Sequence, residues 1–151
     1  MLHIIKSYLN FILNSKNEHG VHSPFVFSLV NKCFYDNKKY AEYSILKNYR
    51  NSLLANKNTI AVTDFGAGSR VFKSNTRAIN QLAKTAGISS KRAELLFRIT
   101  NYFQPESILE IGTSLGLATS ALSLGNPKAI RLFCLIFQRF WLFDLSLWCC
   151  F

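Results

Sequence analysis

The stretch Ser107-Ile-Leu-Glu-Ile-Gly-Thr-Ser-Leu-Gly116 decides the fold of this chain. Its short aliphatic run ends in the carboxylate of Glu110 and predicts a buried parallel strand. Gly112 permits a tight turn and a close approach of a ligand to the backbone, because it has no Cβ. An Ala/Leu/Ser-rich helix begins across Gly116, and its N-terminus offers free N–H groups to an anion. The stretch predicts either a ligand-binding strand–loop–helix or an ordinary one with a glycine turn.

The spacing of the glycines differs from that of two common nucleotide-binding loops. A P-loop requires G-x-x-x-x-G-K-[ST], which does not occur in the chain, and a dinucleotide loop requires G-x-G-x-x-G. The pattern Glu110-x-Gly112-x-x-x-Gly116 instead resembles motif I of the class I S-adenosylmethionine (SAM) methyltransferases, and is most similar to the small-molecule O-methyltransferases.

This resemblance implies a Rossmann-like α/β fold in which the glycine loop holds the amino-acid end of SAM. It also implies that Thr119 offers its hydroxyl to the carboxylate of the cofactor. The cofactor-binding residues that it implies are Glu110, Gly112, Thr113, Ser114, Gly116 and Thr119.

A second unusual stretch is His19-Gly-Val-His22-Ser-Pro-Phe-Val-Phe27. It resembles the helical N-terminal extension of a bacterial subgroup of SAM methyltransferases. The two histidines do not predict a metal site, because Gly20 and Pro24 break any helix that would align them and no cluster of ligands lies nearby. Ser23-Pro24 predicts a helix N-cap and first residue. We expect the buried face of that helix to comprise Phe25, Leu29, Val30 and Phe34.

Hydrophobic periodicity and capping residues predict five further helices, over residues 2–14, 40–56, 76–86, 90–103 and 115–124. In the fourth of these the residues expected to point inward are Leu95, Leu96, Ile99, Tyr102 and Phe103. Between the second and third helices, the glycines of Asp64–Arg70 predict a flexible turn, a lid or substrate-side loop. Asp64 and Arg70 there either contact substrate or, more simply, bond within the turn.

The composition points away from several classes of protein. The chain of 151 residues has a net charge of +10, but its lysines and arginines are scattered, so we expect no nucleic-acid binding. Its four cysteines show no C-x-x-C pair and no metal-binding spacing. No secretory signal pattern is evident, and we expect a reducing cytoplasmic location.

The last residues depart from the family pattern. Residues 129–151 are mostly apolar and contain both tryptophans but no lysine or glycine. The resemblance implies a second strand here, ending in an acidic residue for the ribose of SAM, yet no carboxylate lies between Glu110 and Asp144. Two explanations remain open: a membrane- or partner-binding segment, or a reading frame that is lost near Lys128.

We therefore expect an α/β chain in three parts: a helical N-terminal extension or lid (1–75), the first βα unit of an incomplete Rossmann-like SAM-binding domain (76–128), and an anomalous tail (129–151). The resemblance implies SAM-dependent methyl transfer to a small-molecule acceptor. We expect the chain as given to be a truncated and inactive fragment of such an enzyme, and its sequence does not identify a catalytic base. The alternative is a non-enzymatic, membrane- or partner-associated basic protein with an apolar C-terminal anchor. In either case membrane contact is possible only through 129–151.

Overall fold

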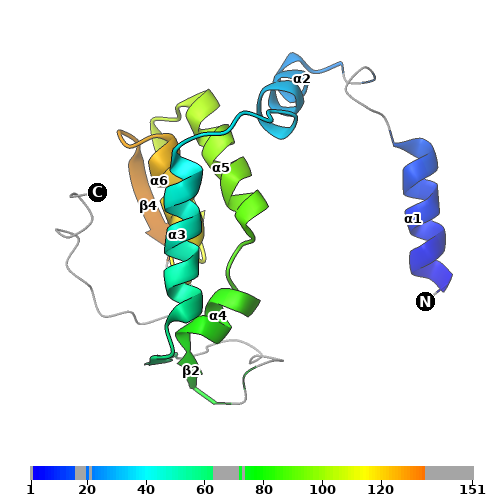
Figure 1. Ribbon diagram of the computed structural model, residues 1–151. Helices are drawn as coiled ribbons and strands as arrows, with labels where there is room; N and C mark the ends of the chain where they lie inside the picture. The colour runs from blue at the N-terminus through cyan, green and yellow to red at the C-terminus, as the bar shows by residue number, and fades with distance from the viewer. Residues whose placement is uncertain (1, 16–19, 21, 63–71, 73, 135–151) are drawn as a thin grey trace. The chain divides into compact units, whose positions relative to one another are not determined.

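The computed structural model describes residues 2–15, 20, 22–62, 72 and 74–134, and these form a mixture of helices and short strands (Figure 1). The chain divides into two compact units, Met1–Lys38 and Lys39–Phe151. The predicted boundary after residue 75 falls within the second unit. A mixed helix-and-strand composition agrees with the predicted class.

The first unit contains α1 (Leu2–Asn14), α2 (Pro24–Leu29) and the short π-helix η2 (Val30–Phe34). The predicted helix over 2–14 is confirmed, and so is the cap at Ser23, whose hydroxyl accepts a hydrogen bond of 3.4 Å from the N–H of Val26. The predicted buried face is wrong at Phe25, which is 60% exposed, and at Phe34, which is 47% exposed. A helix buries a face only against another layer, and among the described residues of this unit only Cys33 is buried.

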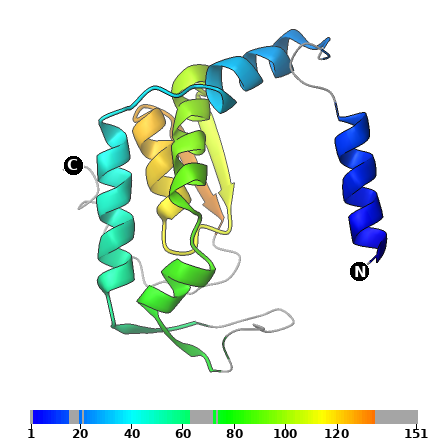
Figure 2. The ribbon, with the colours of Figure 1, turned by 45° about the vertical axis from the view of Figure 1, so that its right-hand side comes forward.

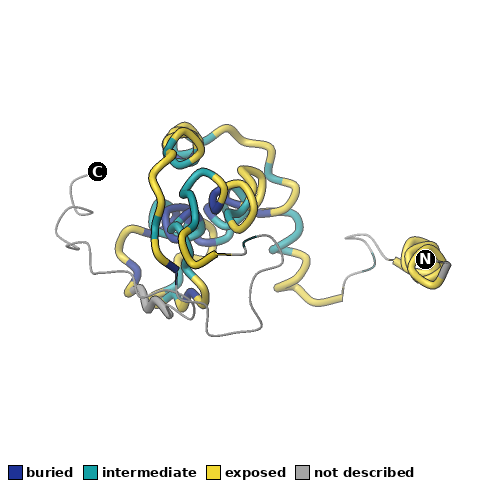
Figure 3. The backbone as a smooth tube through the Cα atoms, turned by 90° about the horizontal axis from the view of Figure 1, so that it is seen from below, coloured by how far each residue is buried: buried dark blue, intermediate teal, exposed yellow. Residues whose placement is uncertain are grey.

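In the second unit, α3 (Glu42–Ala55), α5 (Ser90–Phe103) and α6 (Leu117–Gly125) run side by side (Figures 1 and 2). The predicted helices over 40–56, 90–103 and 115–124 are thereby confirmed within two residues at each end. Buried residues, drawn in dark blue in Figure 3, gather in the interior of the second unit. The core there consists of Leu46, Ala93, Phe97 and Ala121, with the rings of Tyr40 and Tyr43 packed edge-on against Phe97.

Gly125 of α6 packs directly against Thr100 of α5. The buried residues of α5 are Ala93, Phe97 and Thr100, whereas Tyr102 is 44% exposed. The predicted inward face is therefore wrong at Tyr102 and Phe103. A Cβ on Gly125 of α6 would lie 2.7 Å from the Cβ of Thr100, so the helices approach too closely for large side chains between them.

Helix α6 connects two parallel strands, β3 (Ser107–Ile111) and β4 (Ile130–Cys134). Ser107 pairs with Ile130, and Ile111 at the other end pairs with Cys134. The predicted parallel strand before the glycine loop is thus present, and β4 begins inside the segment 129–151. The prediction that this strand is buried is wrong for most of its residues. Alternate residues of β3 face opposite sides: Glu110 is buried, while Leu109 and Ile111 are each about two-thirds exposed.

A second pair of strands was not anticipated. β1 (Thr59–Ala61) pairs antiparallel with β2 (Thr76–Ala78), and α4 (Ile79–Thr85) follows β2 directly. The helix predicted over 76–86 is therefore wrong in its first three residues, because their backbone groups bond to β1. The predicted glycine turn, with Asp64 and Arg70, lies outside the described residues.

Candidate functional site

The loop between β3 and α6 has an unusual backbone. Gly112 has φ +83°, Ser114 +50° and Gly116 +70°, all in the left-handed region that favours glycine. The N–H of Gly116 donates to the carbonyl of Thr113 at 3.0 Å and closes the turn. Gly116 is the N-cap of α6 and has no side chain that could accept from the first turn of the helix. The helix N-terminus therefore presents its N–H groups and the positive end of its dipole to this loop.

Open space lies beside Gly112. A Cβ placed on this glycine would find no atom of the described residues within 4 Å. Gly116 is more enclosed, with the Tyr49 hydroxyl 3.6 Å and the Thr119 hydroxyl 3.9 Å from the corresponding position. The space at Gly112 adjoins the carboxyl end of a parallel strand, which is where open α/β sheets bind ligands.

Glu110 and Thr119, both predicted to bind the cofactor, bond to each other. The Thr119 hydroxyl donates to the Glu110 carboxylate at 2.6 Å, and only 9% of each residue is exposed. Burial raises the pKa of the Glu110 carboxyl, and the hydrogen bond from Thr119 partly opposes that rise. The bond fastens the first turn of α6 to the end of β3. Whether Thr119 also meets a cofactor carboxylate stays a prediction.

Thr113 and Ser114, the other predicted loop residues, lie between the two glycines. The Thr113 hydroxyl is buried and has no hydrogen-bond partner among the described residues. An unpaired buried hydroxyl is unfavourable, and a small shift of the loop toward a bound polar group would satisfy it. The loop thus brings together all six predicted residues, four from the turn itself and one from each flanking element.

Tyr49 of α3 is a seventh residue of the site, and it lies outside the motif. Its hydroxyl donates to the carbonyl of Leu115 at 2.8 Å and so holds the loop from the side. Burial raises the pKa of this hydroxyl, which keeps it a neutral donor. Since 66 positions separate the two residues, no local pattern could have indicated the contact.

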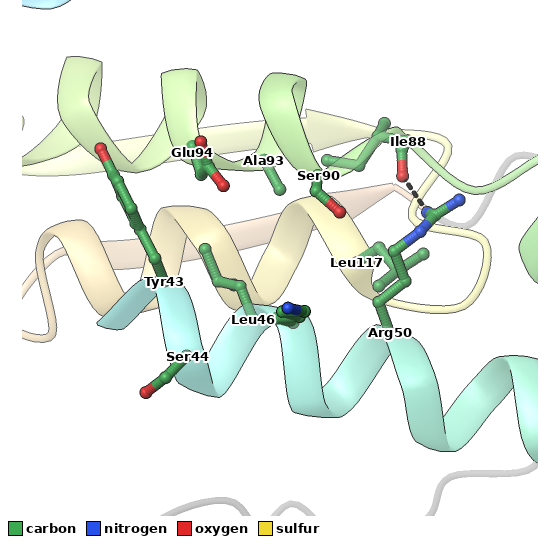
Figure 4. A pocket seen from close by; sticks show the side chains of 10 residues that line it. Tyr43, Ser44, Leu46, Arg50, Ile88, Ser90, Ala93, Glu94 and Leu117 are labelled. Carbon is green, nitrogen blue, oxygen red and sulfur yellow. Dashed lines mark hydrogen bonds between the residues drawn. The ribbon is translucent and has the colours of Figure 1, made fainter. Parts of the chain in front are cut away.

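A cavity of about 370 Å³ lies between α3 and α5 and adjoins the glycine loop (Figure 4). Leu117, the first residue of α6, forms part of its wall. Arg50 of α3 points across one end of the cavity and donates to the carbonyl of Ile88. Ser90 and Glu94 of α5 line the side that faces α3. The cavity is therefore of mixed polarity and lies one residue from the glycine loop.

The described residues contain no group of three His, Cys, Asp or Glu side chains placed to hold a metal ion. His22 is exposed, and His19 lies outside the described residues. No helix in the described ranges is long and apolar enough to cross a bilayer.

Comparisons with known proteins found no relative that could indicate what the site binds. No family model matches the chain, and neither a curated protein nor a solved structure matches it.

Proposed function

We propose that β3, α6 and β4 form the first βαβ unit of a Rossmann-like SAM-binding domain, and that the chain is built as a SAM-dependent methyltransferase. The observation that carries the proposal is the open space beside Gly112, at the end of a parallel strand and at the start of a helix. The left-handed backbone accounts for a glycine at this position, and the open space beside it leaves room for a ligand to approach the backbone.

The arrangement suits the amino-acid end of SAM. The carboxylate would meet the N–H groups of the first turn of α6 beyond Gly116, where charge and dipole are favourable. Glu110 supplies the negative charge that faces a bound ammonium group, and its bond to Thr119 orients it. Thr113 and Ser114 line the loop between these two groups. When bound, SAM supplies an electrophilic methyl group on a sulfonium sulfur.

The ribose end of the proposed site departs from the family pattern. The second strand ends at Cys134 rather than at an acidic residue, and no carboxylate follows before Asp144. A site without this hydrogen-bond acceptor would hold the ribose hydroxyls weakly, so we expect the chain to bind SAM less tightly than a complete methyltransferase domain. The methyl acceptor would be a small molecule, and the cavity beside Leu117 is within the size range of small-molecule sites.

Titration calorimetry of the full chain with S-adenosylhomocysteine, the demethylated cofactor, tests the proposal. We expect saturable binding that falls at least about tenfold in Gly112→Ala, because the added methyl group enters the proposed ligand space. Ser107→Ala, at the exposed opposite end of the same strand, is the matched control and should bind like the wild type. Absence of binding to the folded wild-type chain, or equal binding by Gly112→Ala, would contradict the proposal.

A further inference from the structure

The first helix has an apolar surface that no described residue of its own unit covers. In α1 every large hydrophobic residue whose burial is described is exposed, from Ile12 at 49% to Leu13 at 82%. The others are Ile4, Ile5, Tyr8, Leu9 and Phe11. Helices of globular proteins bury such residues against a second layer, so a surface of this extent indicates a binding face.

The two faces of α1 are sharply separated. At about 100° per residue, the apolar side chains from Phe11 round to Leu13 cover about 200° of the circumference. The remaining arc holds only polar residues: His3, Lys6, Ser7, Asn10 and Asn14. The Asn14 amide donates to the side chain and carbonyl of Asn10 at 2.8 Å, so polar groups pair along this face.

Width and charge together favour one occupant. A helix that pairs with a second helix needs a narrower stripe, whereas a helix that lies in a membrane interface buries a broad one. The helix contains Lys6 but no acidic residue, so its own charge is positive only and complements an anionic lipid surface. Its 13 residues span about 20 Å, too short to cross a bilayer of about 30 Å.

We propose that α1 lies flat in the headgroup region of an anionic lipid bilayer, with its apolar face toward the acyl chains and Lys6 toward the headgroups. This site differs from segment 129–151, through which the sequence predicted membrane contact, and it is independent of the proposed cofactor site. The helix would attach the chain to a membrane surface.

Co-flotation of the full chain with vesicles tests the proposal and separates bound protein from aggregates. Vesicles of phosphatidylcholine with about 30% phosphatidylserine are compared with pure phosphatidylcholine. Leu9→Gln/Ile12→Gln alters the apolar face, and Ser7→Gln/Asn10→Gln alters the polar face with the same spacing and no change of charge. Glutamine is a good helix former, so both variants keep the helix.

We expect the apolar-face variant to bind anionic vesicles at least about tenfold more weakly than the wild type, and the polar-face variant to bind like the wild type. Lys6→Gln should bind about fivefold more weakly to anionic vesicles only. Equal binding by the two double variants, or no binding by the wild type, would overturn the proposal. A lower unfolding free energy in the apolar-face variant alone, without vesicles, would also overturn it, because α1 would then pack on the chain itself.

Discussion

Helix α6 has glycines near both ends, and their surroundings are opposite. Gly112, in the loop that precedes the helix, has a left-handed backbone, and no atom of the described residues lies within 4 Å of where its Cβ would stand. Gly125, its last residue, would place a Cβ 2.7 Å from the Cβ of Thr100 and 2.8 Å from the carbonyl oxygen of Phe97. The first glycine leaves space empty, and the second lets two helices fill it.

If the proposed function is correct, this difference separates function from stability within one element. At its C-terminal end α6 is held by close packing against α5, so glycine there serves the fold. At its N-terminal end glycine serves a turn beside unoccupied space, with a buried carboxylate and an unpaired hydroxyl close by. Proteins place unfavourable groups of this kind at binding sites and compensate for them elsewhere.

The largest effect should come from Gly125→Ala. Alanine usually stabilises a helix relative to glycine by about 0.5–1 kcal/mol. Here the methyl group meets the backbone of α5, so we expect the free energy of unfolding to fall by about 2–3 kcal/mol. Urea unfolding measures this free energy. An unchanged or higher stability would show that α5 and α6 move apart readily to admit the methyl group, and the contrast between the two glycines would then be wrong.

Gly112→Ala should have a smaller effect on folding, although it has the larger effect on binding. No atom obstructs the added methyl group, so only the left-handed backbone is unfavourable, by about 1–2 kcal/mol. Gly112→Asn sharpens the test, because asparagine tolerates this conformation and should recover part of that stability. Recovery of cofactor binding in the same variant would show that conformation, not space, is what the site requires.

Tyr49→Phe should lower the free energy of unfolding by about 1 kcal/mol, because the carbonyl of Leu115 loses its donor. Tyr43→Phe is the matched control: it lies on the same helix, and its hydroxyl accepts from Arg98 at 3.0 Å. Both variants should lose similar stability. Only Tyr49→Phe should weaken binding of S-adenosylhomocysteine, and equal weakening by Tyr43→Phe would mean that Tyr49 does not position the loop.

The sequence predicted those parts of the fold that depend on neighbouring residues. The helices and the Ser23 cap were found because periodicity and capping act within one or two turns. The strand over Thr76–Ala78 was not found, because it forms only through its pairing with Thr59–Ala61. The inward face of α5 was wrong for a similar reason. The face of α5 that packs against Gly125 of α6 includes Thr100, and Tyr102 lies on a different side of the helix.

The same division holds for the site. The motif predicted the glycines and Glu110, which are close in sequence. It did not indicate that Glu110 bonds to Thr119 rather than standing free, nor that α3 supplies Tyr49. Those contacts arise when segments distant in sequence pack together, and a residue pattern contains no information on their geometry.

Glu110→Gln should have the smallest effect on stability, and its sign depends on pH. Because burial raises the pKa of Glu110, the folded chain holds this proton more tightly than the unfolded chain. The unfolding free energy of the wild type should therefore fall as pH rises from the usual glutamate pKa of about 4.3 through the raised value. Glutamine keeps an acceptor for Thr119 without the charge, so the variant should lack this fall and be the more stable near neutral pH.

Urea unfolding of both proteins on either side of that pH range measures the difference. Parallel stability curves would mean that the carboxylate is not destabilised by burial, and the N-terminal end of α6 would then resemble the C-terminal end in being optimised for folding. If Glu110→Gln is instead more stable and binds S-adenosylhomocysteine less tightly, the buried charge serves the ligand at the expense of the fold. A substitution at one residue that raises the free energy of unfolding but weakens ligand binding would place the function of α6 at its N-terminus.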